Sequence, residues 1–367
     1  MELIEINFQS VNKEIQNSRN IIYGAGYNGR FLYELLSSNH IPVEAFYDDD
    51  ESRWGDLFCD KKILSKNELD VLDKNTICIL ISSMYIGQIT FKLEKMGFER
   101  AFVSFATLQE KDSDEFQFHK YKDNLDYRND LENLINISKD DQTKRYFQLI
   151  KKSVASGKAL PEIVDLYCGE KQYFLNCFKG KLNGLSFLDG GAYTGDTVRE
   201  LLGEEINPEV VYCFEANLVN YKKLKKFASE NEKMCKLVCE NLALWNANTK
   251  LGMEFENYNS RIDRNAKDLV VQAVTIDEYF RNKKLGFIKM DMEGAERKAL
   301  EGGMKTIKRD RPILAISMYH GLDDIVEIPK MFMWKQEIKN YFFFVRHHSY
   351  TYSETVLYGI PEESNIL

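Results

Sequence analysis

The 367-residue chain lacks several features that mark particular classes of protein. No apolar run approaches the roughly 18 residues of a membrane-spanning helix. The N-terminal stretch MELIEINFQS carries acids where a secretory signal peptide carries cations. A net charge of −8 also lacks the cation excess that binding to a nucleic-acid backbone requires. We therefore expect a cytoplasmic protein without a membrane span and without a nucleic-acid partner.

The seven cysteines are an odd number and include no Cys-x-x-Cys pair. Most lie in apolar runs, which is typical of reduced core residues rather than of disulfides or zinc ligands. Internal repeats and low-complexity tracts are also missing. With 44% hydrophobic and 13% aromatic residues the chain is globular, and its length favours two domains.

Strands alternate with helices in the first 110 residues. We expect strands at 20–23, 43–47, 76–82 and 101–105, with helices at 30–38 and 86–96. Such alternation implies parallel pairing with right-handed crossovers. The pattern predicts a Rossmann-like α/β domain over residues 1–110.

Residues 111–184 have a different character, and from residue 185 the alternation returns. Charged helical patterns at 126–137 and 140–154 predict a helical connector and cap over 111–184, with Asp140 and Asp141 at a helix start. Further strands are expected at 185–188, 210–214, 236–244, 271–274, 286–290 and 312–317. Two late aromatic strands, 341–346 and 355–358, predict an antiparallel hairpin that edges a parallel sheet over residues 185–367.

A glycine-punctuated turn, FLDGGAYTGDT, links the first strand of this second domain to a helix. Gly191 and Gly195 let the backbone approach a ligand closely. The turn has neither the Lys nor the spacing of a phosphate-binding Walker loop. It better suits a ligand with an amino-acid tail, whose ammonium would pair with Asp189 while the amides near Asp196 and Thr197 face its carboxylate.

Polar residues stand at the ends of several predicted strands of the second domain. They are Asp189, Glu215, Asp291 and His320. In a parallel sheet the ligand lies beyond the carboxyl ends of the strands, where the chain switches direction. Glu215 closes the run VVYCFEAN and is suited to the hydroxyls of a ribose. These residues therefore predict one nucleoside site.

Four segments together resemble the FkbM family of methyltransferases: FLDGGAYTGDT, VVYCFEAN, TIDEYF and FIKMDMEGAERKALEG. The later SMYHGLDD, VRHHS and ETVLYGI resemble a subset of that family. The match covers roughly residues 185–360, and its most distinctive element runs from Lys289 to Glu296. It implies a class I, S-adenosylmethionine-dependent fold associated with O-methylation of sugars and natural products. Tyr193 departs from the smaller, often Asn-bearing loops of other members.

The resemblance also implies which residues hold the cofactor. Asp189, Gly191 and Gly195 would wrap its methionine part, and Glu215 would bind the ribose hydroxyls. The rest of the cofactor edge would be Ala216 and Asn217 beside the ribose, with Asn241, Leu242 and Ala243 beside the adenine. The expected architecture is thus two Rossmann-like domains joined by a helical connector, the second with a class I methyltransferase sheet.

Methyl transfer from a sulfonium needs in-line alignment and a dry pocket. A nearby base would add a factor of about 10²–10⁴ for an alcohol acceptor. Asp291 is the first candidate for this base and His320 the second. Glu293 and Glu296 would orient sugar hydroxyls or cap the helix that they begin. No ligand pair has a recognisable metal-binding spacing, so we expect no metal site.

A second fingerprint, Gly24-Ala25-Gly26-Tyr27-Asn28-Gly29, lies between a strand and a helix near the N-terminus. Asp48 ends the next strand, as in a dinucleotide-binding unit. The predicted unit resembles the small Rossmann-like domains that precede sugar acyltransferases. The resemblance implies that this half binds or positions a nucleotide-sugar or a related glycan donor, with Asp48 on a ribose. The alternative is a packing turn without a ligand.

The function that we expect is S-adenosylmethionine-dependent O-methylation of a sugar hydroxyl, in polysaccharide or glycoconjugate biosynthesis. The partner would be a small-molecule or glycan acceptor, for which a nucleotide-sugar is one candidate. A second interpretation is an NAD-dependent sugar-nucleotide oxidoreductase, although a Tyr-x-x-x-Lys pair is missing near the first domain. A third is a non-catalytic scaffold that binds nucleotide-sugars. The acceptor and the oligomeric state do not follow from the sequence.

Overall fold

The computed structural model describes residues 2–6, 13–83, 86–104, 116–256, 259–262, 270–335 and 338–364. The chain divides into two compact units. The first contains residues 1–122, 155–167 and 349–352, and the second contains residues 123–154, 168–348 and 353–367. Each unit is built on its own seven-stranded sheet.

The first unit has the Rossmann-like alternation predicted from its sequence. Its sheet has the order β1 (Glu2–Glu5), β7 (Arg100–Val103), β6 (Ile77–Ile81), β2 (Arg19–Tyr23), β3 (Ala45–Tyr47), β5 (Lys61–Leu64) and β4 (Leu57–Phe58). All pairs are parallel except β4 with β5. The helices are α1 (Lys13–Asn17), α2 (Tyr27–Ser38), α3 (Lys66–Asp70) and α4 (Ile86–Lys95).

Both faces of this first sheet are buried. Ile21 packs in one apolar cluster and Ile22 in another, because successive side chains of a strand point to opposite faces. A strand that is buried on both faces is apolar throughout, as is typical of parallel sheets covered by helices.

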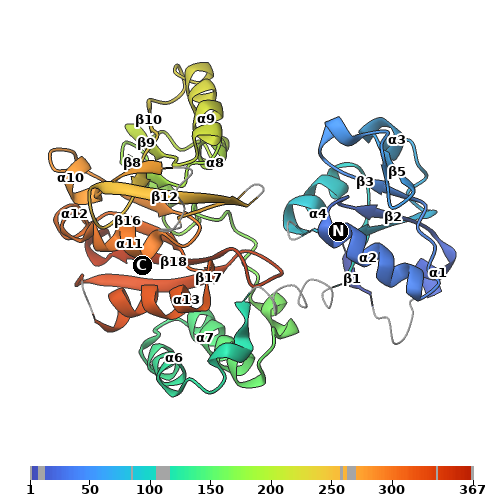
Figure 1. Ribbon diagram of the computed structural model, residues 1–367, viewed down its shortest axis with the longest axis horizontal. Helices are drawn as coiled ribbons and strands as arrows, with labels where there is room; N and C mark the ends of the chain where they lie inside the picture. The colour runs from blue at the N-terminus through green and yellow to red at the C-terminus, as the bar shows by residue number, and fades with distance from the viewer. Residues whose placement is uncertain are drawn as a thin grey trace. The chain divides into compact units, whose positions relative to one another are not determined.

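The second unit contains the predicted parallel sheet with an antiparallel hairpin at its edge (Figure 1). The order is β10 (Leu237–Glu240), β9 (Val210–Phe214), β8 (Ser186–Gly190), β15 (Phe287–Met290), β16 (Ile313–Ser317), β18 (Thr355–Pro361) and β17 (Tyr341–His347). The first five strands are parallel, and β18 pairs antiparallel with both β16 and β17. The chain therefore switches direction between β8 and β15, which is where such sheets bind ligands.

Helices cover this sheet, among them two from the segment expected to be a helical connector. The helices are α6 (Leu125–Ile137), α7 (Asp141–Ser156), α8 (Asp196–Gly203), α9 (Leu218–Glu230), α10 (Ile276–Tyr279), α11 (Glu296–Glu301), α12 (Met304–Asp310) and α13 (Leu322–Pro329). The predicted helices at 126–137 and 140–154 are confirmed. Asp140 begins the second of them by accepting hydrogen bonds from the backbone and hydroxyl of Thr143. Helix α6 packs against α13 (Figure 1).

One predicted strand was wrong in its extent. Residues 236–244 form two strands in different sheets, because the chain bends at Asn241, whose Nδ2 donates to the carbonyls of Glu215 (2.8 Å) and Ala216 (3.0 Å). The second piece belongs to a four-stranded sheet that the sequence patterns did not predict. Its order is β11 (Ala243–Leu244), β14 (Val270–Val274), β12 (Thr249–Glu256) and β13 (Asn259–Ile262).

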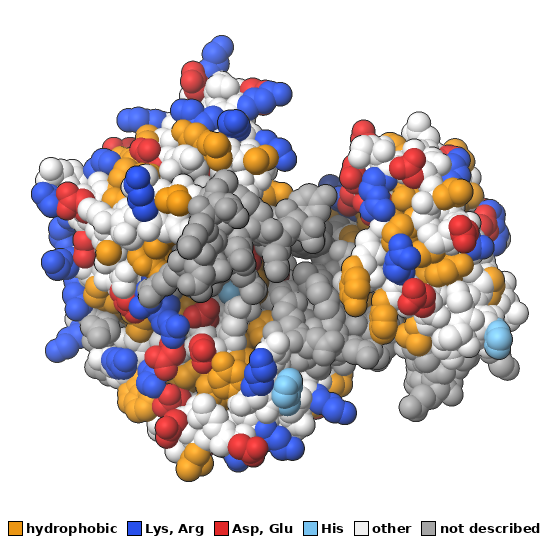
Figure 2. Space-filling model, in the orientation of Figure 1, with side chains coloured by type: hydrophobic (Ala, Val, Ile, Leu, Met, Phe, Trp, Pro, Cys, Tyr) orange, Lys and Arg blue, Asp and Glu red, His pale blue; other side chains and the backbone are white. Residues whose placement is uncertain are grey.

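Charged side chains mark the solvent side of the helices. Figure 2 shows Lys and Arg gathered over α9, where Lys222, Lys223 and Lys226 are exposed. On the opposite side of α9, Leu224 and Phe227 are buried against the sheet. In the part of the chain that the structure describes, no helix has the length and apolar character needed to cross a membrane.

Candidate active site

An ion pair is buried at the point where the second sheet switches direction. Asp189 on β8 and Lys289 on β15 are register partners, and Lys289 Nζ lies 3.1 Å from Asp189 Oδ1. Only 3% of each side chain is exposed. Burial raises the pKa of Asp189 above its ordinary value, and Lys289 offsets part of that rise. Burial alone lowers the pKa of Lys289, but the carboxylates of Asp189, Asp291 and Asp196 raise it above its ordinary value.

Lys289 also ties the glycine turn to the sheet. Its Nζ donates to the carbonyl oxygens of Gly190 (3.4 Å) and Gly191 (3.0 Å). The pairing of Asp189 with the ammonium of a ligand stays a prediction, and in the structure the ammonium that faces Asp189 is that of Lys289.

The two glycines of the turn are required by close backbone approach. Gly191 has φ +74°, and a Cβ there would lie 1.8 Å from the carbonyl oxygen of Asp291. Gly195 has φ +89°, and a Cβ there would lie 2.4 Å from the ring of Phe227. Tyr193 keeps a left-handed φ of +46° and is exposed. The turn therefore presses against the end of β15, which brings the first cofactor motif beside Asp291.

Glu215 lies beneath the same turn, directly after β9. One carboxylate oxygen accepts from the backbone N–H of Tyr193 (2.8 Å) and the other from that of Asn217 (2.7 Å). Burial raises the pKa of Glu215 to about 7. Each oxygen of an ionised carboxylate can accept more than one hydrogen bond, so Glu215 keeps capacity for the hydroxyls of a ribose.

The other residues predicted for the ribose and adenine edge lie around Glu215. Asn217 begins α9 by accepting from the backbone N–H of Val219 (2.8 Å). The contacts of Asn241 bring it against Ala216, and Leu242 and Ala243 follow it into β11. At the other side of the turn, α8 begins at Asp196, which is exposed, and Thr197 is buried.

Asp291 follows β15 and is the centre of a hydrogen-bond network. Its Oδ2 accepts from the hydroxyl of Tyr173 (2.9 Å) and its Oδ1 from that of Tyr319 (3.1 Å). Burial and the charge of Asp291 raise the pKa of both tyrosines well above the ordinary value, so both remain donors. Burial alone raises the pKa of Asp291, but Lys289 and His320 outweigh it and hold that pKa below its ordinary value. A quarter of the Asp291 side chain, 25%, is exposed, so a ligand can reach it.

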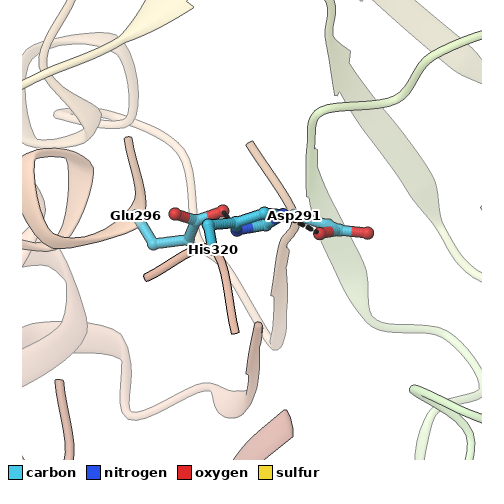
Figure 3. Close-up of side chains that lie close together, drawn as sticks. All are labelled: Asp291, Glu296 and His320. Carbon is cyan, nitrogen blue, oxygen red and sulfur yellow. Dashed lines mark ion pairs between the residues drawn. The ribbon is translucent and has the colours of Figure 1, made fainter. Parts of the chain in front are cut away.

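The ring of His320 lies between two carboxylates. Figure 3 shows Glu296, His320 and Asp291 in a row, with Nδ1 3.1 Å from Glu296 Oε1 and Nε2 3.3 Å from Asp291 Oδ1. Glu296 is buried and also accepts from the backbone N–H of Met292. Burial alone lowers the pKa of His320, but Glu296, Asp291 and Glu293 raise it to about 10. A protonated imidazole accepts no proton, so of the two predicted bases this geometry favours Asp291.

Among the described residues, Asp291, Glu296 and His320 form a group that could hold a metal ion, with one atom from each within 4.8 Å of the others. The two ring nitrogens face different carboxylates, an arrangement that a protonated imidazole satisfies by itself (Figure 3). The absence of a metal stays a prediction. Glu293 has a left-handed φ of +53°, and its Oε2 lies 3.9 Å from His320 Nε2, while its role toward an acceptor stays a prediction.

The structure adds residues to the site that sequence reasoning did not single out. Gln172 Nε2 donates to Glu354 Oε2 (2.8 Å) and contacts the hydroxyl of Tyr173 (3.0 Å). The hydroxyl of Tyr319 lies 3.5 Å from Glu354 Oε1. Burial, followed by the charge of Asp291, raises the pKa of Glu354 to about 7. The only sequence signal was that Tyr319 and Glu354 lie in segments resembling part of the FkbM family.

The fingerprint of the first unit has a similar local geometry. Asp48, after β3, accepts from the backbone N–H of Ala25 in the glycine turn (2.8 Å), as Glu215 does in the second unit. Gly24 has φ +110°, and a Cβ at Gly29 would lie 2.0 Å from the carbonyl oxygen of Gly24. Gly26 is exposed at the start of α2. Packing explains two of the glycines, so a nucleotide site here stays a prediction.

Comparison with known proteins agrees with the geometry of the second unit. Residues 189–352 match the family model described as Methyltransferase FkbM domain, and residues 16–103 match the model described as C2185-like, N-terminal. No curated protein is significantly similar in sequence.

A solved structure has a similar fold along the chain, and others are similar to about half of it. Methyltransferase FkbM from Methylobacillus flagellatus KT is 19% identical with a TM-score of 0.54, over 95% of this chain and 91% of that one. An rRNA methylase from Streptococcus thermophilus is 13% identical with a TM-score of 0.34, over 52% of this chain and 95% of that one. A putative rRNA-methylase from Clostridium thermocellum is 10% identical with a TM-score of 0.33, over 49% and 87%.

The strand order of the second sheet and the family match define a class of protein, the S-adenosylmethionine-dependent methyltransferases. More closely, residues 189–352, most of which lie in the second unit, match the methyltransferase FkbM domain. Residues 16–103 match the C2185-like N-terminal model, and the likeness of the first unit to the domains before sugar acyltransferases stays a prediction.

Proposed function

We propose that the protein transfers the methyl group of S-adenosylmethionine to a hydroxyl of a sugar during polysaccharide or glycoconjugate biosynthesis. The observation that carries this proposal is the pairing of two acidic groups across one glycine turn. Glu215 lies under the turn on the β9 side, and the partly exposed Asp291 lies against it on the β15 side. One group suits a ribose, and the other suits a hydroxyl acceptor.

The residues present fit the cofactor. Glu215 keeps acceptor capacity for a ribose, and the left-handed backbone at Gly191 and Gly195 lets the turn lie close to the residue after β15 and to α9. When bound, S-adenosylmethionine supplies an electrophilic methyl group on a positively charged sulfur. Lys289 holds the turn against β15, which fixes the position of the cofactor side of the site relative to the acceptor side.

The acceptor side favours an uncharged polyol. Asp291, Glu293 and Glu354 present carboxylates there, and carboxylates accept hydrogen bonds from hydroxyls. The same carboxylates repel phosphates, which disfavours a nucleic-acid backbone as the group held next to the methyl. A sugar hydroxyl donates hydrogen bonds to these carboxylates and carries no negative charge that they would repel. The phosphates of a nucleotide-sugar would have to lie outside this cluster of carboxylates.

For the first unit we propose a nucleotide-sugar ligand, because Asp48 contacts its glycine turn as Glu215 contacts the turn of the second unit. An oxidoreductase would instead bind NAD there, and a scaffold would bind nucleotide-sugars without methyl transfer.

Calorimetry separates these functions. S-adenosylmethionine, NAD and UDP-glucose are each titrated into the wild type, Glu215→Ala and Asp48→Ala. We expect Glu215→Ala to lose affinity for S-adenosylmethionine and to keep UDP-glucose, with the reverse for Asp48→Ala. Binding of NAD but not of S-adenosylmethionine would contradict the proposed function. Transfer of labelled methyl from S-adenosylmethionine to a panel of nucleotide-sugars, chosen by thermal stabilisation, then identifies the acceptor.

A further inference from the structure

Two carboxylates, Asp291 and Glu354, face the acceptor side of the site in different electrostatic states. They are joined by two hydrogen-bonded bridges, one through Tyr319 and the other through Tyr173 and Gln172. Joined carboxylates with separated pKa values commonly divide the acid and base roles of a reaction between them.

Asp291 is engaged at both of its oxygens. Tyr173 donates to Oδ2, while Tyr319 donates to Oδ1 and His320 lies 3.3 Å from that oxygen. Its pKa is held below the ordinary value, and a carboxylate of low pKa is a weak base for an alcohol. The contacts suit Asp291 to holding three side chains in place.

Glu354 is less engaged. Gln172 donates to Oε2 at 2.8 Å, whereas the contact of Oε1, with Tyr319, is long at 3.5 Å. The residue lies half-buried in the turn between β17 and β18, directly before the first residue of β18. Oε1 therefore has room to accept a hydrogen bond from a ligand hydroxyl.

The backbone around this network is strained. Glu354 has φ +58° and Tyr173 has φ +70°, although neither is glycine. Non-glycine residues rarely adopt this conformation and persist in it where the surrounding structure fixes them, commonly at active sites. Here the bonds of Gln172 to both side chains join the two strained positions.

Building on the proposed methyl transfer, we propose that Glu354 is the general base that takes the proton of the acceptor hydroxyl, and that Asp291 positions the tyrosines and His320. As the O–CH₃ bond forms, the S–CH₃ bond breaks and its electron pair stays on sulfur. The hydroxyl proton moves to Glu354 Oε1 and later leaves to water. The products are the methyl ether, S-adenosylhomocysteine and one proton.

The charged groups around Glu354 support this role. Burial and the charge of Asp291 raise its pKa to about 7, while Gln172, His320 and Lys289 lower it. A base of this pKa is about half ionised at neutral pH, and its ionised form holds a proton well enough to assist transfer. Turnover should therefore fall as the pH drops below about 7.

The first test needs no acceptor. Infrared pH titration compares Glu215→Gln with the double variant Glu215→Gln/Glu354→Gln. The shared Glu215→Gln change removes one carboxyl whose pKa is raised to about 7, and Asp324, whose pKa is raised to about 6, is present in both proteins. We expect the difference between the two titrations to be the protonated-carboxyl signal of one group with a midpoint near 7. If the two titrations are the same, Glu354 is not the poised carboxylate and the proposal is overturned.

The second test uses the nucleotide-sugar found by the methyl-transfer panel. Glu354→Gln should lower kcat by about 10²–10⁴-fold and remove the acid limb of its pH profile, with unchanged affinity for S-adenosylmethionine. Gln172→Ala should move that limb to higher pH, because it removes a bond that stabilises the ionised form. Glu232→Gln, at an exposed position on the same unit, is the matched control and should change neither.

The failures of the two proposals are distinguishable. A wild type that binds no S-adenosylmethionine contradicts the methyltransferase function itself. A wild type that transfers methyl, together with Glu354→Gln that transfers it equally fast with the same pH profile, refutes only the assignment of Glu354. Unchanged cofactor affinity in Glu354→Gln shows that any loss of kcat does not come from misfolding.

Discussion

Replacing Lys289 with methionine tests how the two halves of the second sheet are held together. Lys289 and Asp189 form an ion pair in which 3% of each side chain is exposed, and breaking such a pair leaves a buried charge without its partner. Removing one partner of a buried pair typically costs about 3–5 kcal/mol. The carbonyls of Gly190 and Gly191 lose a donor as well, at about 0.5–1.5 kcal/mol each.

The double variant Asp189→Leu/Lys289→Met separates these two contributions. It removes both charges, so only the carbonyl bonds are lost, and we expect it to recover all but about 1–3 kcal/mol. Lys298→Met, which breaks an exposed pair with Glu301, is the control and should cost at most about 1 kcal/mol.

Urea unfolding measures these differences in one unit at a time. In a Trp54→Phe background the two remaining tryptophans, Trp245 and Trp334, belong to the second unit, so fluorescence follows that unit alone. A cost for Lys289→Met no larger than that of the control would refute the reasoning. So would a double variant less stable than Lys289→Met.

Four further predictions follow from the site. Affinity for S-adenosylmethionine should be constant above pH 7 and fall about tenfold per pH unit below it, because ribose hydroxyls favour the ionised form of Glu215. Calorimetry of Glu215→Gln should show a lower affinity that does not depend on pH in this way. The stability that His320 contributes should be fully present below about pH 6.5, which is the pKa of an unfolded histidine, and it should be lost as the pH rises towards 10. In chemical unfolding, the free energy of His320→Gln should therefore differ most from that of the wild type at neutral pH and below. Gly191→Ala should abolish cofactor binding in calorimetry, since its Cβ overlaps the carbonyl of Asp291, whereas Gly203→Ala, where a Cβ meets no atom, should keep it. Methyl transfer should survive treatment with EDTA, and a loss restored by a divalent cation would instead assign a metal to Asp291, Glu296 and His320.

The sheet of the second unit was predictable because each of its central strands is an apolar run closed by a polar residue. The prediction of strand 210–214 agrees with β9 in both bounds, and the acid that follows it takes its expected place under the glycine turn. The four-stranded sheet was missed because β11 has two residues and pairs with β14, some thirty positions later. The periodicity of hydrophobic residues within one segment does not show which distant segment it pairs with.

The site was predictable only where it comes from strand ends. Tyr173 and Asp291 are 118 positions apart, and the contact between them depends on how the segment that follows α7 packs on the sheet. Glu354 reaches the network from a turn in which residues 349–352 cluster with the first unit and residue 353 returns to the second. The protonation of His320 depends on carboxylates from two elements, so its unperturbed pKa was a poor guide to its role.

The claim on which the rest depends is that one edge of the second sheet binds the cofactor with its sulfur directed at the acceptor carboxylates. A crystal structure with bound S-adenosylhomocysteine measures this directly. We expect ribose hydroxyls within hydrogen-bonding distance of Glu215 and the sulfur on the side of Asp291 and Glu354. A ligand bound elsewhere, or with its sulfur directed away from both carboxylates, would contradict it.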